Sequence, residues 1–291
     1  MKKMIFALTA SAAMLSYAEE AREAAPEMEK KSAPIVWGFG NYGIYSGYQL
    51  YGSLLNPEPT LQGYLECNVN LPFEVGPFDD LGYVGAGIWS NTDLTGRRKD
   101  SYRRAFNEND PNVHYEKSFW FDDDKTWGVK WRTYFVWYYY PHTRRPYTAT
   151  TVDWDNSFEL LNPYVIPFLD VIYEFHENNA LLYQFGLKRT FAITDDLSVT
   201  PQVVGVIRDH RYNWCFPTAG FTEFHNGGWA TMRFQLDANY KITPWLGVFA
   251  KVAFCTTVDG SLRDASDHSS GADYGKYRDF AWGGCGLSVN F

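Results

Sequence analysis

From about residue 35 onward, apolar and polar residues alternate in stretches of about ten to fourteen residues, separated by short runs rich in Gly, Pro, Asn and Asp. A period of two is that of a β-strand with one apolar and one polar face. Its repetition at this length is typical of a transmembrane barrel, so the pattern predicts an all-β, antiparallel up-and-down barrel of twelve strands. The predicted strands are 35–49, 59–71, 81–92, 112–121, 126–140, 154–161, 164–175, 179–192, 196–208, 228–241, 244–257 and 276–291.

The connections favour the same strand order. An even number of strands places both chain ends on one side of the membrane, which is the periplasm in a single-chain barrel. The periplasmic turns are then mostly tight, and the outward loops are 51–58, 91–111, 141–153, 176–178, 209–227 and 259–275. The least regular piece is 154–161, because Pro163 and Pro167 follow it. A ten-stranded barrel is the alternative, with 154–175 as one kinked strand and 112–121 lost.

The two ends of the chain indicate export. Residues 1–18 carry two lysines, an apolar run and the small residues Ser16 and Ala18, as a cleavable signal peptide does. Residues 19–34 form a short periplasmic leader, and 35–291 form the barrel. The last strand alternates up to Phe291, which resembles the signal that the barrel assembly machinery reads. The alternative is the edge strand of a secreted sandwich.

Composition separates a barrel from a helical membrane protein. No stretch of eighteen apolar residues follows the signal, yet the chain carries 11 Trp, 21 Tyr and 21 Phe, which suits two interfacial aromatic girdles. Without Lys2 and Lys3 the chain has 26 − 2 = 24 basic and 34 acidic residues, a net charge of −10. An acidic chain without a basic block argues against a nucleic-acid partner.

The four cysteines are expected to be free thiols. By strand parity Cys67 and Cys285 face lipid and Cys255 faces the lumen, while Cys215 lies in a loop. Side chains on opposite faces cannot be bridged without moving the backbone. A structural disulfide is the alternative, and the spacings match no zinc pattern.

Strand parity also predicts which charged residues line the lumen, since a charge facing lipid costs several kcal/mol near the midplane. The predicted lining residues are the bases Lys130, Arg132, Lys188, Arg233 and Lys251 and the acids Glu66, Glu116, Asp170, Glu174 and Asp237. They could make a weakly selective polar channel, with Lys130 and Arg132 biasing ion flow. They could equally be ion pairs that fill and brace the barrel.

Three runs are similar to the opening of the TorF-type porins: Asn41 to Tyr48, Glu58 to Gly63 and Gly85 to Asn91. Tyr138 to Pro141 resembles the end of the fifth strand of that family, and the resemblance is good from Trp37 to Pro141 and thinner afterwards. It implies a barrel and a presumed pore without a settled substrate. Where the family usually has an Arg, this chain has Tyr51 and Gly52, so any role of that Arg does not carry over.

The function expected from these patterns is a porin-like channel in the outer membrane of a Gram-negative bacterium, for passive passage of small polar solutes or ions. No catalytic, cofactor-binding or metal-binding residue is assigned, and no oligomeric state. The alternatives are a non-conducting structural or adhesive barrel and, less favoured, a hydrolase using Asp209-His210 and Asp267-His268 in outward loops. A basic cluster is expected to meet lipopolysaccharide phosphates at the outer leaflet: Arg97, Arg98, Lys99, Arg103 and Arg104.

Overall fold

The structure is a computed structural model. It describes residues 35–51, 53–56, 58–72, 81–95, 108–139, 150–176, 179–209, 211, 227–260 and 279–291. The expected signal peptide and leader, Cys215 and the basic cluster of residues 97–104 lie outside these ranges. Within the described ranges no helix is long and apolar enough to cross a membrane.

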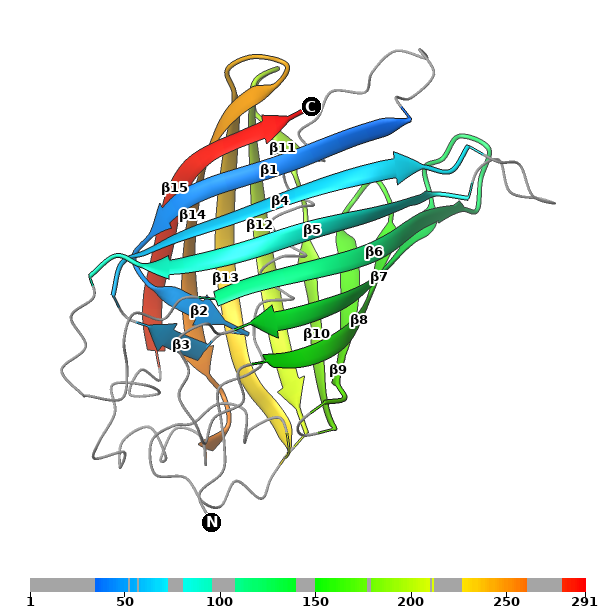
Figure 1. Cartoon of the computed structure of the whole chain (residues 1–291). Coiled ribbons are helices and arrows are strands. Elements are labelled where there is room, and N and C mark those ends of the chain that lie inside the picture. Colours follow the sequence, from blue (N-terminus) through cyan, green and yellow to red (C-terminus); the bar gives the residue numbers. More distant parts are fainter. Residues whose placement is uncertain are drawn as a thin grey trace.

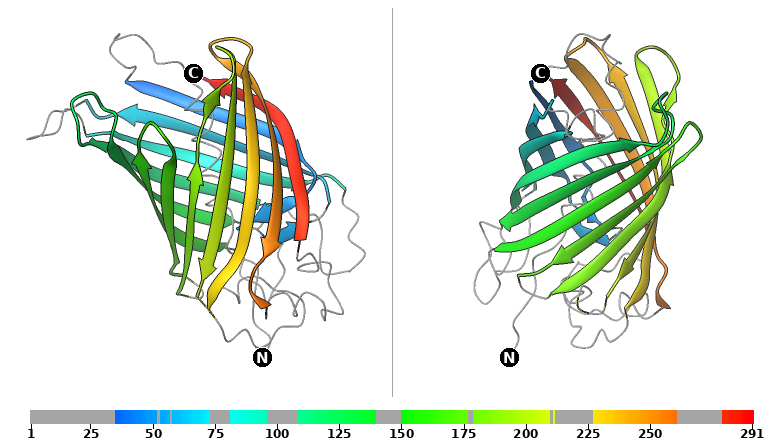
Figure 2. Two further views of the ribbon diagram at one scale, coloured as in Figure 1. Left: turned by 180° about the vertical axis from the view of Figure 1, so that it is seen from behind. Right: turned by 90° about the vertical axis from the view of Figure 1, so that its right-hand side faces the viewer.

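Twelve antiparallel strands form a closed wall (Figure 1). They are β1 (Val36–Tyr45), β4 (Thr60–Asn70), β5 (Tyr83–Asp93), β6 (Glu108–Trp120), β7 (Gly128–Tyr139), β8 (Thr150–Leu161), β9 (Ile166–Glu174), β10 (Ala180–Lys188), β12 (Leu197–Arg208), β13 (Gly228–Lys241), β14 (Leu246–Thr257) and β15 (Asp279–Asn290). Each strand pairs with its neighbours in this order, and β1 pairs with β15 to close the ring. The strands are tilted around one common axis in both views of Figure 2, as closure of a sheet requires.

The predicted fold class is therefore confirmed, and the ten-stranded alternative is wrong. β8 and β9 are separate strands that pair with each other, with Asp153 opposite Glu174 and Glu159 opposite Phe168. Asn162 makes the reversal between them possible, because its side-chain oxygen accepts hydrogen bonds from the backbone N–H groups of Tyr164 and Val165. The piece 112–121 also belongs to the wall, as part of β6.

The outer ends of three strands differ from the prediction. β1 ends at Tyr45 rather than at residue 49, and the chain continues into a separate two-stranded hairpin of β2 (Tyr48–Leu50) and β3 (Ser53–Asn56). β6 and β8 begin at Glu108 and Thr150, earlier than the predicted 112 and 154. The polar composition of these two strand ends resembles that of a loop, but their alternate side chains face the interior. At the end of the wall where β1 begins and β15 ends, which is the expected periplasmic end, the predicted strand 179–192 is shorter, and Phe191–Ala192 form the separate short strand β11.

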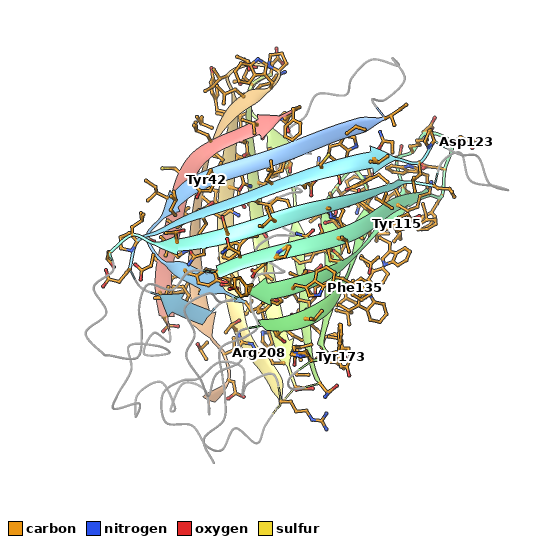
Figure 3. The ribbon with its side chains drawn as sticks, in the orientation of Figure 1. Tyr42, Tyr115, Asp123, Phe135, Tyr173 and Arg208 are labelled. Carbon is orange, nitrogen blue, oxygen red and sulfur yellow. The ribbon has the colours of Figure 1, made fainter. Side chains whose placement is uncertain are left out.

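The outer face of the wall is apolar, with aromatic residues concentrated at its two ends. Phe135 and Tyr42 project from it in Figure 3, and their side chains are 42% and 49% exposed. Near the periplasmic end the exposed aromatic residues are Trp120, Phe121, Trp127, Tyr164, Phe191, Tyr240, Trp245 and Phe291. Near the outer end they are Trp137, Tyr139, Trp154, Phe175, Trp229 and Phe254. Aliphatic side chains such as Leu65, Val113 and Leu236 occupy the band between, which is the layering that a bilayer requires.

Phe291 lies at the seam where the ring closes. Its backbone exchanges two hydrogen bonds with Gly38 of β1, at 2.7 and 3.0 Å. Its ring covers Gly38, where an added Cβ would overlap the ring. Glycine at position 38 is therefore required for this contact, in which the last residue extends the β1–β15 ladder.

The cysteine prediction is confirmed for the three described residues. Cys67, Cys255 and Cys285 are free thiols, of which Cys255 is buried and the other two are exposed. The faces are those that strand parity assigns.

Candidate functional site: the charged lumen

The ten predicted lining residues lie on the interior of the wall. Nine of them are buried, and the side chain of Lys130 is 12% exposed. They occupy alternate positions along their strands, opposite to the exposed apolar residues. Side chains on the interior can reach across to strands that are not neighbours in the wall, and several of these residues make such contacts.

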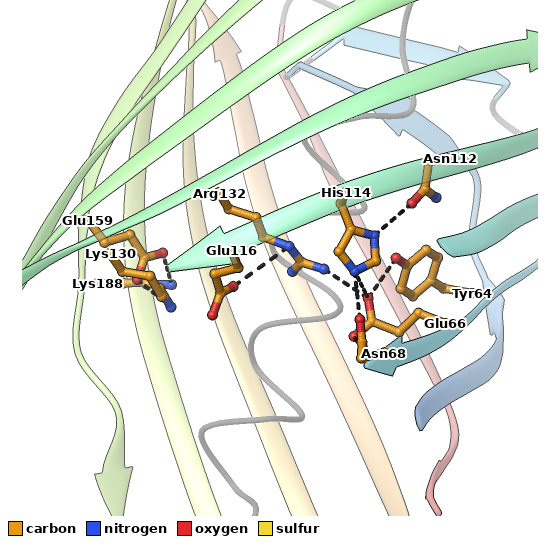
Figure 4. Close-up of polar contacts among 10 residues, drawn as sticks. All are labelled: Tyr64, Glu66, Asn68, Asn112, His114, Glu116, Lys130, Arg132, Glu159 and Lys188. Carbon is orange, nitrogen blue, oxygen red and sulfur yellow. Dashed lines mark hydrogen bonds and ion pairs between the residues drawn. The ribbon is translucent and has the colours of Figure 1, made fainter. Parts of the chain in front are cut away.

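The first group of contacts, which we call the β4–β7 network, joins β4, β6 and β7 (Figure 4). Arg132 donates from Nη2 to Glu66 Oε2 at 2.8 Å, and its Nε lies 3.7 Å from Glu116 Oε2. Glu66 also accepts hydrogen bonds from Tyr64 at 2.8 Å and Asn68 at 2.9 Å. Glu116, Tyr64 and Asn68 therefore add three contacts to one buried ion pair, and these contacts offset the cost of removing the two charges from water.

His114 extends this network. Its Nε2 lies 2.7 Å from the side-chain oxygen of Asn68 and its Nδ1 lies 3.2 Å from that of Asn112. Asn68 is on β4 and His114 is on β6, so the contact passes over β5. Gly85 of β5 makes this possible, because a Cβ at that position would overlap both the Asn68 amide and the His114 ring. At Gly87, two residues further along the same face, an added Cβ would lie 2.8 Å from the Tyr64 hydroxyl.

A second group, the β7–β10 network, centres on Glu159. Lys130 lies 2.9 Å from Glu159 Oε2 and Lys188 lies 2.7 Å from Oε1. Figure 4 shows the two ammonium groups approaching the carboxylate from β7 and β10. The two lysines share the carboxylate of Glu159, one on each oxygen.

The remaining predicted residues lie on other parts of the interior. Lys251 pairs with Asp237 at 3.3 Å, and Gln202 and Gln235 donate to the other oxygen of Asp237. Asp170 accepts a hydrogen bond from Gln184 at 3.3 Å, and Glu174 accepts one from Thr151 at 2.6 Å. Arg233 is buried on β13 beside these groups. Four of the five predicted bases are therefore in ion pairs, and the ten residues do not converge on one site.

The prediction missed several interior acids. Glu108, Asp110, Asp153 and Asp155 are fully buried on β6 and β8, and Glu159 is buried on β8. Glu108, Asp110 and Asp153 fall in the predicted loops 91–111 and 141–153, because Pro111 and the polar run before Trp154 resemble loop sequence. Pro111 is nevertheless a wall residue, paired with Ile88 of β5. The signal that could have found these acids is their own alternation, since 108, 110, 112, 114 and 116 share one face.

In the described part of the chain no group of three or more His, Cys, Asp or Glu side chains is arranged to hold a metal ion. The described interior carries eleven acids against six bases, not counting the buried Lys117, which strand parity places on the outer face. The acids are Glu66, Asp93, Glu108, Asp110, Glu116, Asp153, Asp155, Glu159, Asp170, Glu174 and Asp237, and the bases are Lys130, Arg132, Lys188, Arg208, Arg233 and Lys251.

No protein-family model matches the sequence, and no curated protein matches it. Among solved structures, the chain is similar to an outer-membrane channel from Pseudomonas putida, with 10% identity, 91% of this chain and 100% of that chain covered, and a TM-score of 0.52. Two further similar structures are the NanC porin (13% identity, 86% and 98% covered, TM-score 0.48) and outer membrane phospholipase A from Escherichia coli (9% identity, 87% and 92% covered, TM-score 0.46). At these identities the likeness concerns the fold, which is that of an outer-membrane β-barrel.

Proposed function

We propose that the protein is a channel of the outer membrane of a Gram-negative bacterium, through which small polar solutes or ions pass without chemical change. The observation that carries the proposal is the division of the closed wall into an apolar outer face and a charged inner face. Charged residues are expensive against lipid and are placed inward where water fills the lumen. The motif resemblance of residues 37–141 to TorF-type porins supports the same assignment.

The acidic excess of the described interior favours cations over anions. Eleven acids against six bases leave five more negative than positive groups when all are ionised. In a passage with low-dielectric walls, such an excess raises the local concentration of oppositely charged solutes. The paired bases of the β4–β7 and β7–β10 networks act mainly as braces of the wall in this proposal.

The proposal includes no catalysis and no cofactor. Its partners are the lipid of the outer membrane, including lipopolysaccharide, and the barrel assembly machinery. No partner for oligomerisation is proposed.

Single-channel recording on the refolded full-length protein tests the proposal. The expected result is discrete current steps in a planar bilayer and a reversal potential in a KCl gradient that indicates preference for K⁺. Absence of conductance from a folded, heat-modifiable protein would favour the non-conducting barrel instead. A preference for Cl⁻ would contradict the acidic excess as the source of selectivity while leaving the channel itself.

A further inference from the structure

The hairpin of β2 and β3 belongs to no part of the wall, and the described side chains of β2 and of the turn after it are buried. It forms its own two-stranded sheet shortly after β1, where the sequence predicts the end of the strand 35–49 and the outward loop 51–58. Tyr48, Gln49 and Tyr51 are 0%, 3% and 1% exposed. A loop that projected into solvent would leave such side chains accessible, so the hairpin is folded inward.

The tip of the hairpin is hydrogen-bonded to the wall strands β12 and β13. The carbonyl oxygen of Tyr51 accepts hydrogen bonds from Arg208 Nη2 of β12 at 2.9 Å and from Thr231 Oγ1 of β13 at 2.7 Å. A carbonyl oxygen has two lone pairs, and these two donors use both. Tyr51 itself has a φ of 49°, in the left-handed region that bulky residues rarely adopt, and surrounding contacts must hold it there.

The wall is shaped for this contact. The β12–β13 register shifts between Val206 and Ile207, so that Ala230 is an extra residue next to Thr231. A β-bulge of this kind redirects a neighbouring side chain and bends the strand. Arg208 and Thr231 thus present two donors at the outer end of the wall.

The base and side of the hairpin are fixed as well. The carbonyl of Gly47 accepts hydrogen bonds from Trp282 Nε1 of β15 at 2.9 Å and from Thr60 Oγ1 of β4 at 3.4 Å. The ring of Tyr48 packs on Trp89 of β5, with 5.4 Å between the centroids. Leu54 packs against the buried cluster of Tyr45, Ala253, Cys255, Phe280 and Trp282.

We propose that this hairpin is the constriction of the lumen. It lies at the outer mouth, where β1 ends. Tyr48 and Tyr51 contact β5, β12 and β13, and Gly47, directly before the hairpin, is bonded to β4 and β15. A solute must therefore pass beside it, and the two donors to Tyr51 keep it across the mouth. The inference rests on the proposed channel function. It adds that one element, the hairpin, sets the size limit for solutes, whereas the wall charges affect only their charge preference.

The first test removes the hairpin. Tyr45 and Thr60 are paired across β1 and β4, so the strands can be rejoined by a short turn when residues 48–56 are replaced by two glycines. We expect a several-fold larger single-channel conductance and passage of larger sugars in liposome swelling. An increase supports the proposal, and it does so even if the wild type is silent, in which case the hairpin is a plug and passive passage through the wild type is wrong. An unchanged conductance would overturn the constriction and leave the channel, whereas silence of both proteins would overturn both proposals.

The second test releases the tip without deleting anything and has a readout independent of conductance. Cys255 is 0% exposed and belongs to the cluster against which Leu54 of the hairpin packs. Its thiol should therefore be protected from a water-soluble maleimide. In a background with Cys67, Cys215 and Cys285 replaced by Ser, the Arg208→Gln/Thr231→Val variant should label Cys255 several-fold faster than the parent. The matched control is Arg189→Gln, since Arg189 lies at the periplasmic end and donates to the carbonyl of Pro163 rather than to the hairpin. Equal labelling rates in the released variant and the parent, both folded, would overturn the proposed role of the tip contacts.

Discussion

Arg132 on β7 and Glu66 on β4 form an ion pair at 2.8 Å across the interior, over two intervening strands. Both side chains are almost completely buried, with relative exposures of 4% and 1%. The pair therefore links β4 directly to β7, two strands that backbone hydrogen bonds connect only by way of β5 and β6.

Replacing one partner of this pair should cost much more stability than replacing both. Arg132→Gln leaves Glu66 buried without its guanidinium, and we expect the free energy of unfolding to fall by about 3–5 kcal/mol. The double variant Glu66→Gln/Arg132→Gln should recover part of that loss, as measured by urea unfolding in lipid vesicles. Asp124→Asn in an exposed periplasmic turn is the control. Additive losses in the double variant would show that the two groups do not stabilise each other.

Gly85→Ala should break the contact between Asn68 and His114. The added Cβ would overlap both side chains, and repacking of this kind costs about 1–3 kcal/mol. Gly260→Ala is the matched control, because no atom lies within 4 Å of a Cβ at that position. Unfolding in urea compares the two variants, and equal stability would contradict the requirement for glycine at position 85.

Deleting Phe291 should lower the folded yield in cells several-fold. The deletion removes the two backbone hydrogen bonds with Gly38 as well as the ring, whereas Phe291→Ala removes the ring alone. Comparing the heat-modifiable fraction in outer membranes with refolding yield in detergent separates assembly from intrinsic folding. Equal membrane yields for the wild type and the deletion would contradict a role for Phe291 in assembly.

Replacing Lys130 and Arg132 by Gln should shift the reversal potential towards cation preference. The two substitutions remove positive charge next to Glu66 and Glu159, which stay in the lumen. The measurement is the reversal potential of the double variant in a bilayer with a salt gradient. If it stays at the wild-type value while conductance is intact, the two bases serve only as braces.

The wall could be predicted from the sequence because its period of two is strict where lipid meets one face. A register error of one residue would exchange Trp131 and Arg132 between lipid and lumen, so the pattern determines the facing. The alternation is weaker at the outer ends of the strands, where polar residues occur on both faces. Glu108 and Asp153 therefore fall in predicted loops, although they belong to β6 and β8. Ion pairing of the inward charges could be expected from strand parity, but the partners could not be predicted. The pair of Arg132 with Glu66 spans two strands and passes over β5, where Gly85 and Gly87 carry no side chain.

The hairpin has a consequence for the order of events during folding. Its tip contacts join residues far apart in the chain, at sequence separations of 157 for Tyr51 and Arg208 and 180 for Tyr51 and Thr231. Contacts so remote in sequence form late, because the intervening chain must first be arranged. The hairpin therefore leaves the first strand early in the chain but can dock only after β12 and β13 are in place. Until then the outer mouth of the growing barrel is unobstructed, and docking of the hairpin is a late step in forming the barrel.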